Sequence, residues 1–257
     1  MKKITSLLTH SLLVVLLSCK ISDAQTSISK DPPFDGTIFL NPDIITGSDP
    51  STFTSLAYAG QAERTMFDRR VDDWITARPF IFNANYADGL SIEIQLNPEF
   101  NNVAEAEIQA LKYAEVFGKL PTALRMDVHT SWIHKGTHPF GGGNNNLLIY
   151  IGQSLEYEND GILEETLVHE AAHSSLDDYH SASSGWINAQ NLDPNFISTY
   201  ARDNPEREDV AETFLLYLAL RYRPERIDST LKATILETIP NRIKYFDSLN
   251  LKMYPIK

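Results

Sequence analysis

The strongest constraint on the fold is a pair of histidines, His169 and His173, in a segment that reads His-Glu-Ala-Ala-His. A turn at residues 160–161 precedes a helix that we expect to run from Ile162 to about Leu176. On a helix, this spacing projects both imidazoles from the same face, one turn apart. Two ring nitrogens placed in this way suit one tetrahedral zinc ion, so the sequence predicts a metal site on this helix.

Glu170 directly follows the first histidine, and its carboxylate would lie at the flank of the bound metal. From there it would take a proton from a zinc-activated water and return it to a leaving amine. The spacing H-E-x-x-H is the sequence pattern of zinc peptidases. The alternative interpretation is two histidines on a polar helix face that bind no metal.

A hydrolytic zinc site needs a third protein ligand, and two candidates follow the helix. His180 lies seven residues past His173, whereas metzincin peptidases place this histidine six residues past the second one, after a glycine. Met253, in Met-Tyr-Pro near the C-terminus, weakly resembles the methionine of the metzincin Met-turn. The second candidate is Glu208, on a helix that we expect over Pro205 to Tyr222.

Glu212 follows Glu208 by four residues and therefore shares its helix face. A carboxylate at this position would accept a hydrogen bond from the distal nitrogen of a liganding histidine and fix the orientation of the ring. Alternatively, both glutamates are solvated acids on an amphipathic helix. Asp177 and Asp178 either support a liganding histidine or lie at the surface, and the surface interpretation is favoured.

Together these segments resemble the gluzincin metallopeptidases, most closely the lethal-factor-like branch. The resemblance rests on H-E-x-x-H at 169–173 and on Glu-Asp-Val-Ala-Glu-Thr-Phe at 208–214, which follows the E-x-x-A-E-x-F pattern of that branch. It implies a Zn²⁺ cofactor, Glu208 as the third ligand, Glu212 as its helper, and a peptide or protein substrate. The family often has glycine where this chain has Ala172, and the resemblance covers roughly residues 90–222.

The resemblance also assigns a role to Tyr200, which lies shortly before the ligand glutamate. In the lethal-factor-like branch a tyrosine at this place faces the metal, so Tyr200 would donate a hydrogen bond to the developing oxyanion. The alternative for Tyr200 is a partly buried aromatic residue at the start of a helix.

From residue 90 onward the pattern gives the order strand, helix, strand, strand, helix, which predicts an α+β, zincin-like fold with a small mixed sheet. Residues 141–146 are expected to form a turn, and the strand after this turn would lie near the edge of the sheet. Beyond residue 190 the chain is expected to be mainly helical. The expected strands are Ser91–Leu96, Leu124–Ile133 and Leu147–Ile151, and the expected helices are Ala104–Phe117, Ile162–Leu176, Pro205–Tyr222 and Ser229–Asp247.

The N-terminus reads as an export signal. Two lysines precede an apolar stretch at 7–17 that is too short to cross a bilayer, and small residues before Gln25 suit cleavage there. Residues 1–24 are therefore predicted to be a signal peptide, and the protein to be secreted. The alternative is a lipoprotein signal that ends before Cys19, which would then carry a lipid anchor to a bacterial membrane.

Residues 25–89 are interpreted as an N-terminal arm or brace, and residues 90–257 as the peptidase domain. The arm begins with a stretch rich in Ser, Asp and Pro, contains one expected short strand at Thr37–Leu40, and mixes helical and loop signals over 51–79. The pattern leaves open whether the arm is a removable pro-segment, a lid or a folded brace.

Composition limits the partners and the chemistry. The formal net charge is -12 and the pI is about 5.0, and such an acidic chain is not suited to nucleic acid or an anionic membrane. Cys19 is the only cysteine, so the mature domain has neither a disulfide nor a thiol that would block a zinc site. His129, His134 and His138 are expected at the surface or partly buried, with His134 or His138 at the rim of the cleft as the alternative.

The leading hypothesis is hydrolysis of peptide bonds, with the substrate added as a strand along the edge near Leu147–Ile151. One alternative is a zinc-stabilised binding module without turnover. The other is a metzincin-like peptidase that uses His180 as its third ligand. Substrate specificity and oligomeric state stay open at this point.

Overall fold

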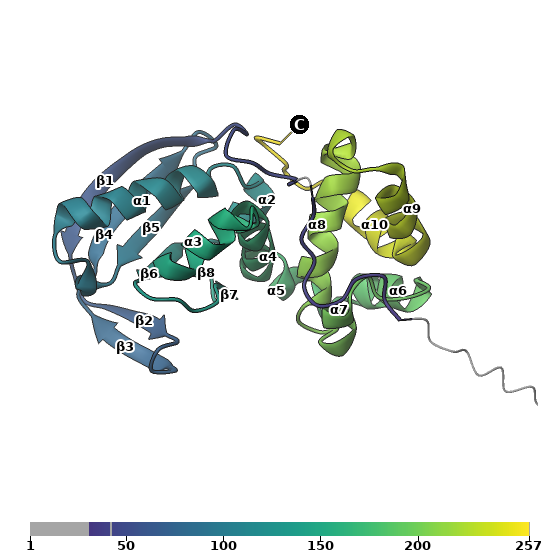
Figure 1. Ribbon diagram of the computed structural model, residues 1–257, viewed down its shortest axis with the longest axis horizontal. Coiled ribbons are helices and arrows are strands. Elements are labelled where there is room, and N and C mark those ends of the chain that lie inside the picture. Colours follow the sequence, from purple (N-terminus) through teal and green to yellow (C-terminus); the bar gives the residue numbers. More distant parts are fainter. Residues whose placement is uncertain (1–30, 42, 257) are drawn as a thin grey trace, which may run out of the picture.

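The computed structural model describes residues 31–41 and 43–256 of the 257-residue chain. The predicted signal peptide at 1–24, Cys19 with its alternative lipid anchor, and the first residues of the N-terminal arm lie outside this part. Figure 1 shows the strands gathered at one end of the molecule and a group of helices at the other end.

One mixed sheet organises the strand-rich end. Its strands run in the order β1-β4-β5-β6-β8-β7, with parallel pairing of β5–β6 and β6–β8 and antiparallel pairing elsewhere. Sheet and helices together confirm the predicted α+β class. The strands are β1 (Phe53–Gln61), β4 (Phe80–Tyr86), β5 (Ser91–Leu96), β6 (Thr130–His134), β7 (Gly141–Gly143) and β8 (Asn146–Tyr150).

The strand at the edge of the sheet is not the one expected from the sequence, because the glycine-rich run itself forms a strand. Residues 141–143 form the terminal strand β7, and only Asn144 and Asn145 form the turn, with φ angles of 52° and 55°. Such positive φ values are what a two-residue hairpin needs, and asparagine tolerates them. The expected strand Leu147–Ile151 is therefore β8, which lies one strand inside the edge.

A separate two-stranded hairpin follows β1. It consists of β2 (Arg64–Asp68) and β3 (Asp73–Ala77), and it lies below the main sheet in Figure 1. The expectation of helical and loop structure over 51–79 was wrong, because this segment forms strands. The pattern did not reveal β1, because it is an exposed edge strand rich in small residues and lacks the usual apolar alternation. Thr37–Leu40 is not a strand, because its backbone N–H groups donate to glutamate side chains instead of to a neighbouring strand.

Two long helices pack on the sheet. Helix α1 (Val103–Phe117) and helix α4 (Leu163–Ser175) confirm the predicted helices there. Helix α2 (Thr122–Arg125) replaces the first half of the strand expected at Leu124–Ile133, because Pro121 starts a helical turn whose Arg125 is buried against Asp88. Two short elements complete this part, the 3₁₀ helix Pro98–Phe100 and helix α3 (Ile151–Asn159).

The C-terminal part is helical, as predicted. The helix expected over Ser229–Asp247 is divided in two, because Pro240 lacks an N–H group and starts a new helix. The helices are α5 (Asp177–His180), α6 (Ser184–Leu192), α7 (Thr199–Asp203), α8 (Asp209–Tyr222), α9 (Ser229–Thr238) and α10 (Pro240–Asp247), with a 3₁₀ helix at Pro224–Arg226.

Helix α8 is the centre of the helical end. Its residues from Asp209 to Leu220 are all buried, and it packs beside α4 between the two ends of the molecule (Figure 1). It begins four residues later than expected, after a turn that contains Glu208. In the described part of the chain, no helix has the length and apolar character to cross a bilayer.

Candidate metal centre

Helix α4 is held tightly between the sheet and α8. Its inner face is fully buried at Leu167, Val168, Ala171 and Ala172. The edge strand lies against the helix backbone, so that a Cβ atom on Gly142 would come within 1.8 Å of the carbonyl oxygen of Glu170. This close packing fixes the position of the helix that carries the two histidines.

The structure brings together His169, His173 and Glu208. Their three ligand atoms form a nearly equilateral triangle: the two Nε2 atoms are 3.1 Å apart, and each lies 3.2 Å from Oε2 of Glu208. A tetrahedral zinc site with bonds of about 2.05 Å has ligand atoms about 3.3 Å apart. Among the described residues these three are the group that fits a metal ion, and their donor set is one that zinc prefers.

A carboxylate lies behind each imidazole, within hydrogen-bond distance for His173 and at a longer ion-pair distance for His169. Nδ1 of His173 lies 2.7 Å from Oδ2 of Asp177, and Nδ1 of His169 lies 3.5 Å from Oε1 of Glu212. A carboxylate on the distal nitrogen fixes the tautomer of a liganding histidine and turns the other nitrogen to the metal. Sequence reasoning anticipated Glu212 but placed Asp177 at the surface, although its spacing of four from His173 was a usable signal.

The charges of this cluster favour a cation at its centre. Burial alone would raise the pKa of Glu208, but hydrogen bonds from His169 and His173 outweigh it and hold this pKa well below the usual range. Burial alone would lower the pKa of His173, but Asp177 and Glu208 raise it to about 10. The half-buried site therefore stabilises positive charge, which a proton or a divalent metal ion supplies.

A cavity of about 490 Å³ opens in front of the three ligand atoms, and Glu170 and Tyr200 line it. The ring of Tyr200 lies nearly parallel to that of His169, with centroids 6.5 Å apart. Burial and the neighbouring Glu208 raise the pKa of Tyr200 to about 12, so its hydroxyl stays protonated at neutral pH and can donate a hydrogen bond. Ser198 accepts a hydrogen bond from Ala201 N and so caps the short helix that carries Tyr200.

The N-terminal arm forms one wall of the same cavity through Thr37 and Phe39. Between them, the N–H of Ile38 donates to Oε2 of Glu212 at 3.1 Å. Further along, the N–H of Leu40 donates to Glu165 on α4 at 2.7 Å. Sequence reasoning missed these contacts, and the one available signal was a glutamate, Glu165, on the otherwise apolar face of the helix.

The structure keeps His180 apart from the other two histidines. Its Nδ1 lies 2.8 Å from the hydroxyl of Tyr245 on α10, and its ring packs edge-on against that tyrosine. Met253 is buried in the C-terminal segment, where the neighbouring carbonyl of Lys252 accepts a hydrogen bond from Ala123. Neither residue joins the ligand triangle.

The three upstream histidines do not line the cavity in front of the ligand triangle. His129 is exposed and His138 half-buried beside Tyr150. His134 is fully buried, so both its expected position at or near the surface and the alternative at the cleft rim were wrong. Burial lowers its pKa to about 4, so the ring stays neutral.

No protein-family model, no curated protein and no solved structure matches this chain. A function for it is therefore argued from the ligand geometry and from the chemistry of the cavity.

Proposed function

We propose that the protein is a zinc-dependent peptidase in which His169, His173 and Glu208 hold Zn²⁺. The observation that carries this proposal is the ligand triangle, with sides of 3.1 and 3.2 Å and a carboxylate behind each imidazole. A chance cluster of polar residues has no reason to present two imidazoles and a carboxylate at the spacing of a tetrahedral site.

The residues around the triangle fit hydrolysis. Zinc, when bound, supplies a Lewis acid that lowers the pKa of a coordinated water. Glu170 lines the cavity beside the ligands, where it takes a proton from the attacking water and passes it to the leaving amine. The protonated hydroxyl of Tyr200 donates a hydrogen bond to the carbonyl oxygen as negative charge develops there.

The substrate would bind as an added strand along β7. This strand is the terminal one of the sheet and adjoins α4, and its first residue, Gly141, lines the catalytic cavity. A peptide that pairs with a sheet edge gains backbone hydrogen bonds, and its scissile bond is then held next to the catalytic groups. The relevant edge is β7 rather than the Leu147–Ile151 segment named from the sequence.

The test is Glu170→Gln, which keeps the size of the side chain and removes the base. Purified variant and wild-type protein are compared for zinc content and for cleavage of a broad peptide library. We expect one equivalent of zinc in both and a loss of cleavage of at least about a hundredfold in the variant. Unchanged cleavage would exclude Glu170 as the base, and a wild-type protein that holds zinc but cleaves nothing would indicate a binding module.

A further inference from the structure

A second cavity, of about 220 Å³, lies next to the catalytic one. Arg69 and Gly141 line both cavities, so the two cavities adjoin at these two residues beside the edge strand β7. The Arg69 guanidinium stands at the junction and donates to the carbonyl of Phe140 at 3.0 Å. A peptide that extends along β7 from the first cavity would therefore lie beside the second cavity, which all three residues of β7 line.

Three aromatic side chains from two different sheets form the wall of this second cavity: Phe67, Trp74 and Trp132. The ring of Trp74 meets that of Trp132 edge-on at 5.2 Å and that of Phe67 at 5.6 Å. Trp74 is nonetheless 50% exposed. An exposed tryptophan in an aromatic cluster beside a cavity is a common mark of a binding surface.

The edge strand leaves this aromatic wall accessible. Gly142 points to α4, and successive residues of a strand point to opposite faces, so Gly141 and Gly143 face the aromatic side. A Cβ atom at Gly143 would meet no atom within 4 Å. At Gly141, in contrast, the Arg69 guanidinium would lie 2.8 Å from an added Cβ atom. A side chain from an added strand can therefore cross β7 at Gly143 and reach the aromatic rings.

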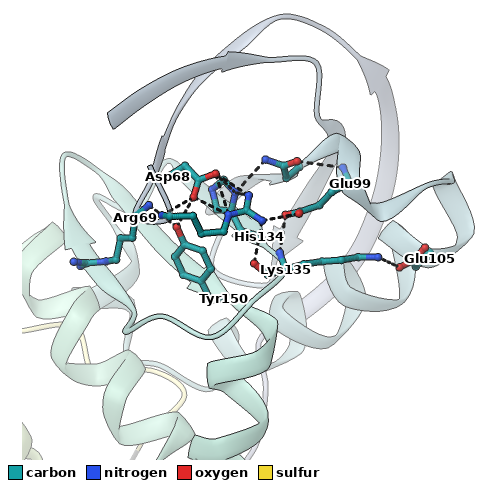
Figure 2. Close-up of polar contacts among 9 residues, drawn as sticks. Asp68, Arg69, Glu99, Glu105, His134, Lys135 and Tyr150 are labelled. Carbon is teal, nitrogen blue, oxygen red and sulfur yellow. Dashed lines mark hydrogen bonds and ion pairs between the residues drawn. The ribbon is translucent and has the colours of Figure 1, made fainter. Parts of the chain in front are cut away.

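The hairpin that carries Phe67 and Trp74 is fixed in place by the polar network drawn in Figure 2. Asp68 accepts hydrogen bonds from Arg70 at 2.7 Å and from the hydroxyl of Tyr150 on β8 at 3.0 Å. The Tyr150 hydroxyl in turn accepts from the backbone N–H of Arg69 at 2.6 Å. Arg70 also pairs with Glu99 at 2.6 Å.

This network is attached to the end of β2, directly after Phe67, and Figure 2 shows the Arg69 side chain pointing away from it. The aromatic wall is therefore held before any ligand arrives. A preformed apolar site loses little conformational entropy when a ligand binds.

We propose that Phe67, Trp74 and Trp132 form an aromatic subsite that binds a large apolar side chain of the substrate, aromatic or leucine-sized. The inference rests on the proposed function, because a strand added at β7 projects alternate side chains to this face of the sheet. The three residues of β7 span only about 10 Å, so the selected side chain lies within about three residues of the scissile bond.

The test uses an array of blocked octapeptides in which Phe or Ala occupies each position in turn. Binding is measured with zinc-loaded Glu170→Gln protein, with and without the additional change Trp74→Ala. We expect Phe to bind about tenfold more tightly than Ala at one position, and Trp74→Ala to remove this preference. Trp74→Phe should restore most of it, which separates a binding role from a folding defect.

Tyr58→Ala is the matched control, because Tyr58 is 43% exposed and packs on Phe82 at the edge of the six-stranded sheet opposite β7. It should leave the preference unchanged.

Cleavage of the same array by proteins with an intact Glu170 separates the two proposals. Cleavage whose Phe preference survives Trp74→Ala would overturn the subsite alone, and Trp74-dependent binding without cleavage would support the subsite and overturn the peptidase. Absence of any Phe preference in binding also overturns the subsite.

Discussion

At the scale of single residues, the proposed metal centre depends on the carboxylates that lie behind its two histidines. Asp177 is half-buried and holds His173 at 2.7 Å, whereas its neighbour Asp178 is exposed. Burial raises the pKa of Asp177, but its hydrogen bond to His173 works in the opposite direction, as expected for a carboxylate paired with a cationic or metal-bound ring. Two adjacent aspartates thus have different surroundings.

Asp177→Ala should weaken zinc binding about tenfold or more, because His173 then loses the partner that fixes its tautomer and orientation. Asp178→Ala is the matched control and should leave zinc affinity unchanged. Competition with a chromogenic chelator measures both affinities. Equal affinities in the two variants would contradict the role assigned to Asp177.

The residue scale is also where the sequence was most informative. H-E-x-x-H and the downstream glutamates have fixed spacings, so the side chains that meet in space could be named in advance. Asp177 could not be assigned in the same way, because an Asp-Asp pair after a helix is equally compatible with the surface. Its spacing of four from His173 was the one sequence signal that separates it from Asp178, and in the structure the hydrogen bond to the His173 ring separates the two.

At the scale of elements, the N-terminal arm and α4 are joined by a buried carboxyl group. Glu165 is 1% exposed and accepts hydrogen bonds from the N–H groups of Leu40 and Ile44, at 2.7 and 2.9 Å. The short strand expected at Thr37–Leu40 was wrong for this reason, since a side chain replaces the partner strand. A contact between positions so far apart in sequence leaves no periodic signal in either segment.

Stability should depend on pH through Glu165. Burial raises its pKa from 4.5 to about 7 in the folded protein, so the folded state binds this proton more tightly than the unfolded state does. The resulting stabilisation is complete below pH 4.5 and is lost as the pH rises to about 7, a change of up to about 3 kcal/mol.

The measurement is urea unfolding of wild-type and Glu165→Gln protein between pH 4.5 and 8. The free energy of unfolding of the wild type, relative to the variant, should fall as the pH rises. A difference that is constant over this range, or that rises with pH, would show that Glu165 is ionised in the folded protein throughout.

At the scale of the whole molecule, α8 joins the two ends, and buried charges hold it in place. The fully buried Arg242 on α10 pairs with Asp209 at 2.8 Å and with Asp193 at 3.1 Å, and all three side chains are 0% exposed. Asp209 directly follows Glu208, so this network fixes the start of α8 next to the proposed metal centre. Composition and helix periodicity predicted a helical C-terminal part but not this network, because buried arginines and exposed ones look alike in a sequence.

Arg242→Ala should lower the free energy of unfolding by about 3 to 5 kcal/mol, because it leaves two buried aspartates without their cation. Arg221→Ala is the control, since Arg221 and its partner Asp247 are 37% and 38% exposed. Loss of that pair should cost less than about 1 kcal/mol. Chemical denaturation measures both, and comparable losses would contradict a special role for the buried network.

The most direct test of the account is the zinc content of single variants after dialysis, measured by atomic emission. Wild-type protein and His180→Ala should hold one equivalent of zinc, since His180 is bound to Tyr245 and lies outside the ligand triangle. Glu208→Ala should lose most of it, because a third ligand and a negative charge are removed together. Full zinc in Glu208→Ala with a loss in His180→Ala, or no zinc in the wild type, would contradict the central claim.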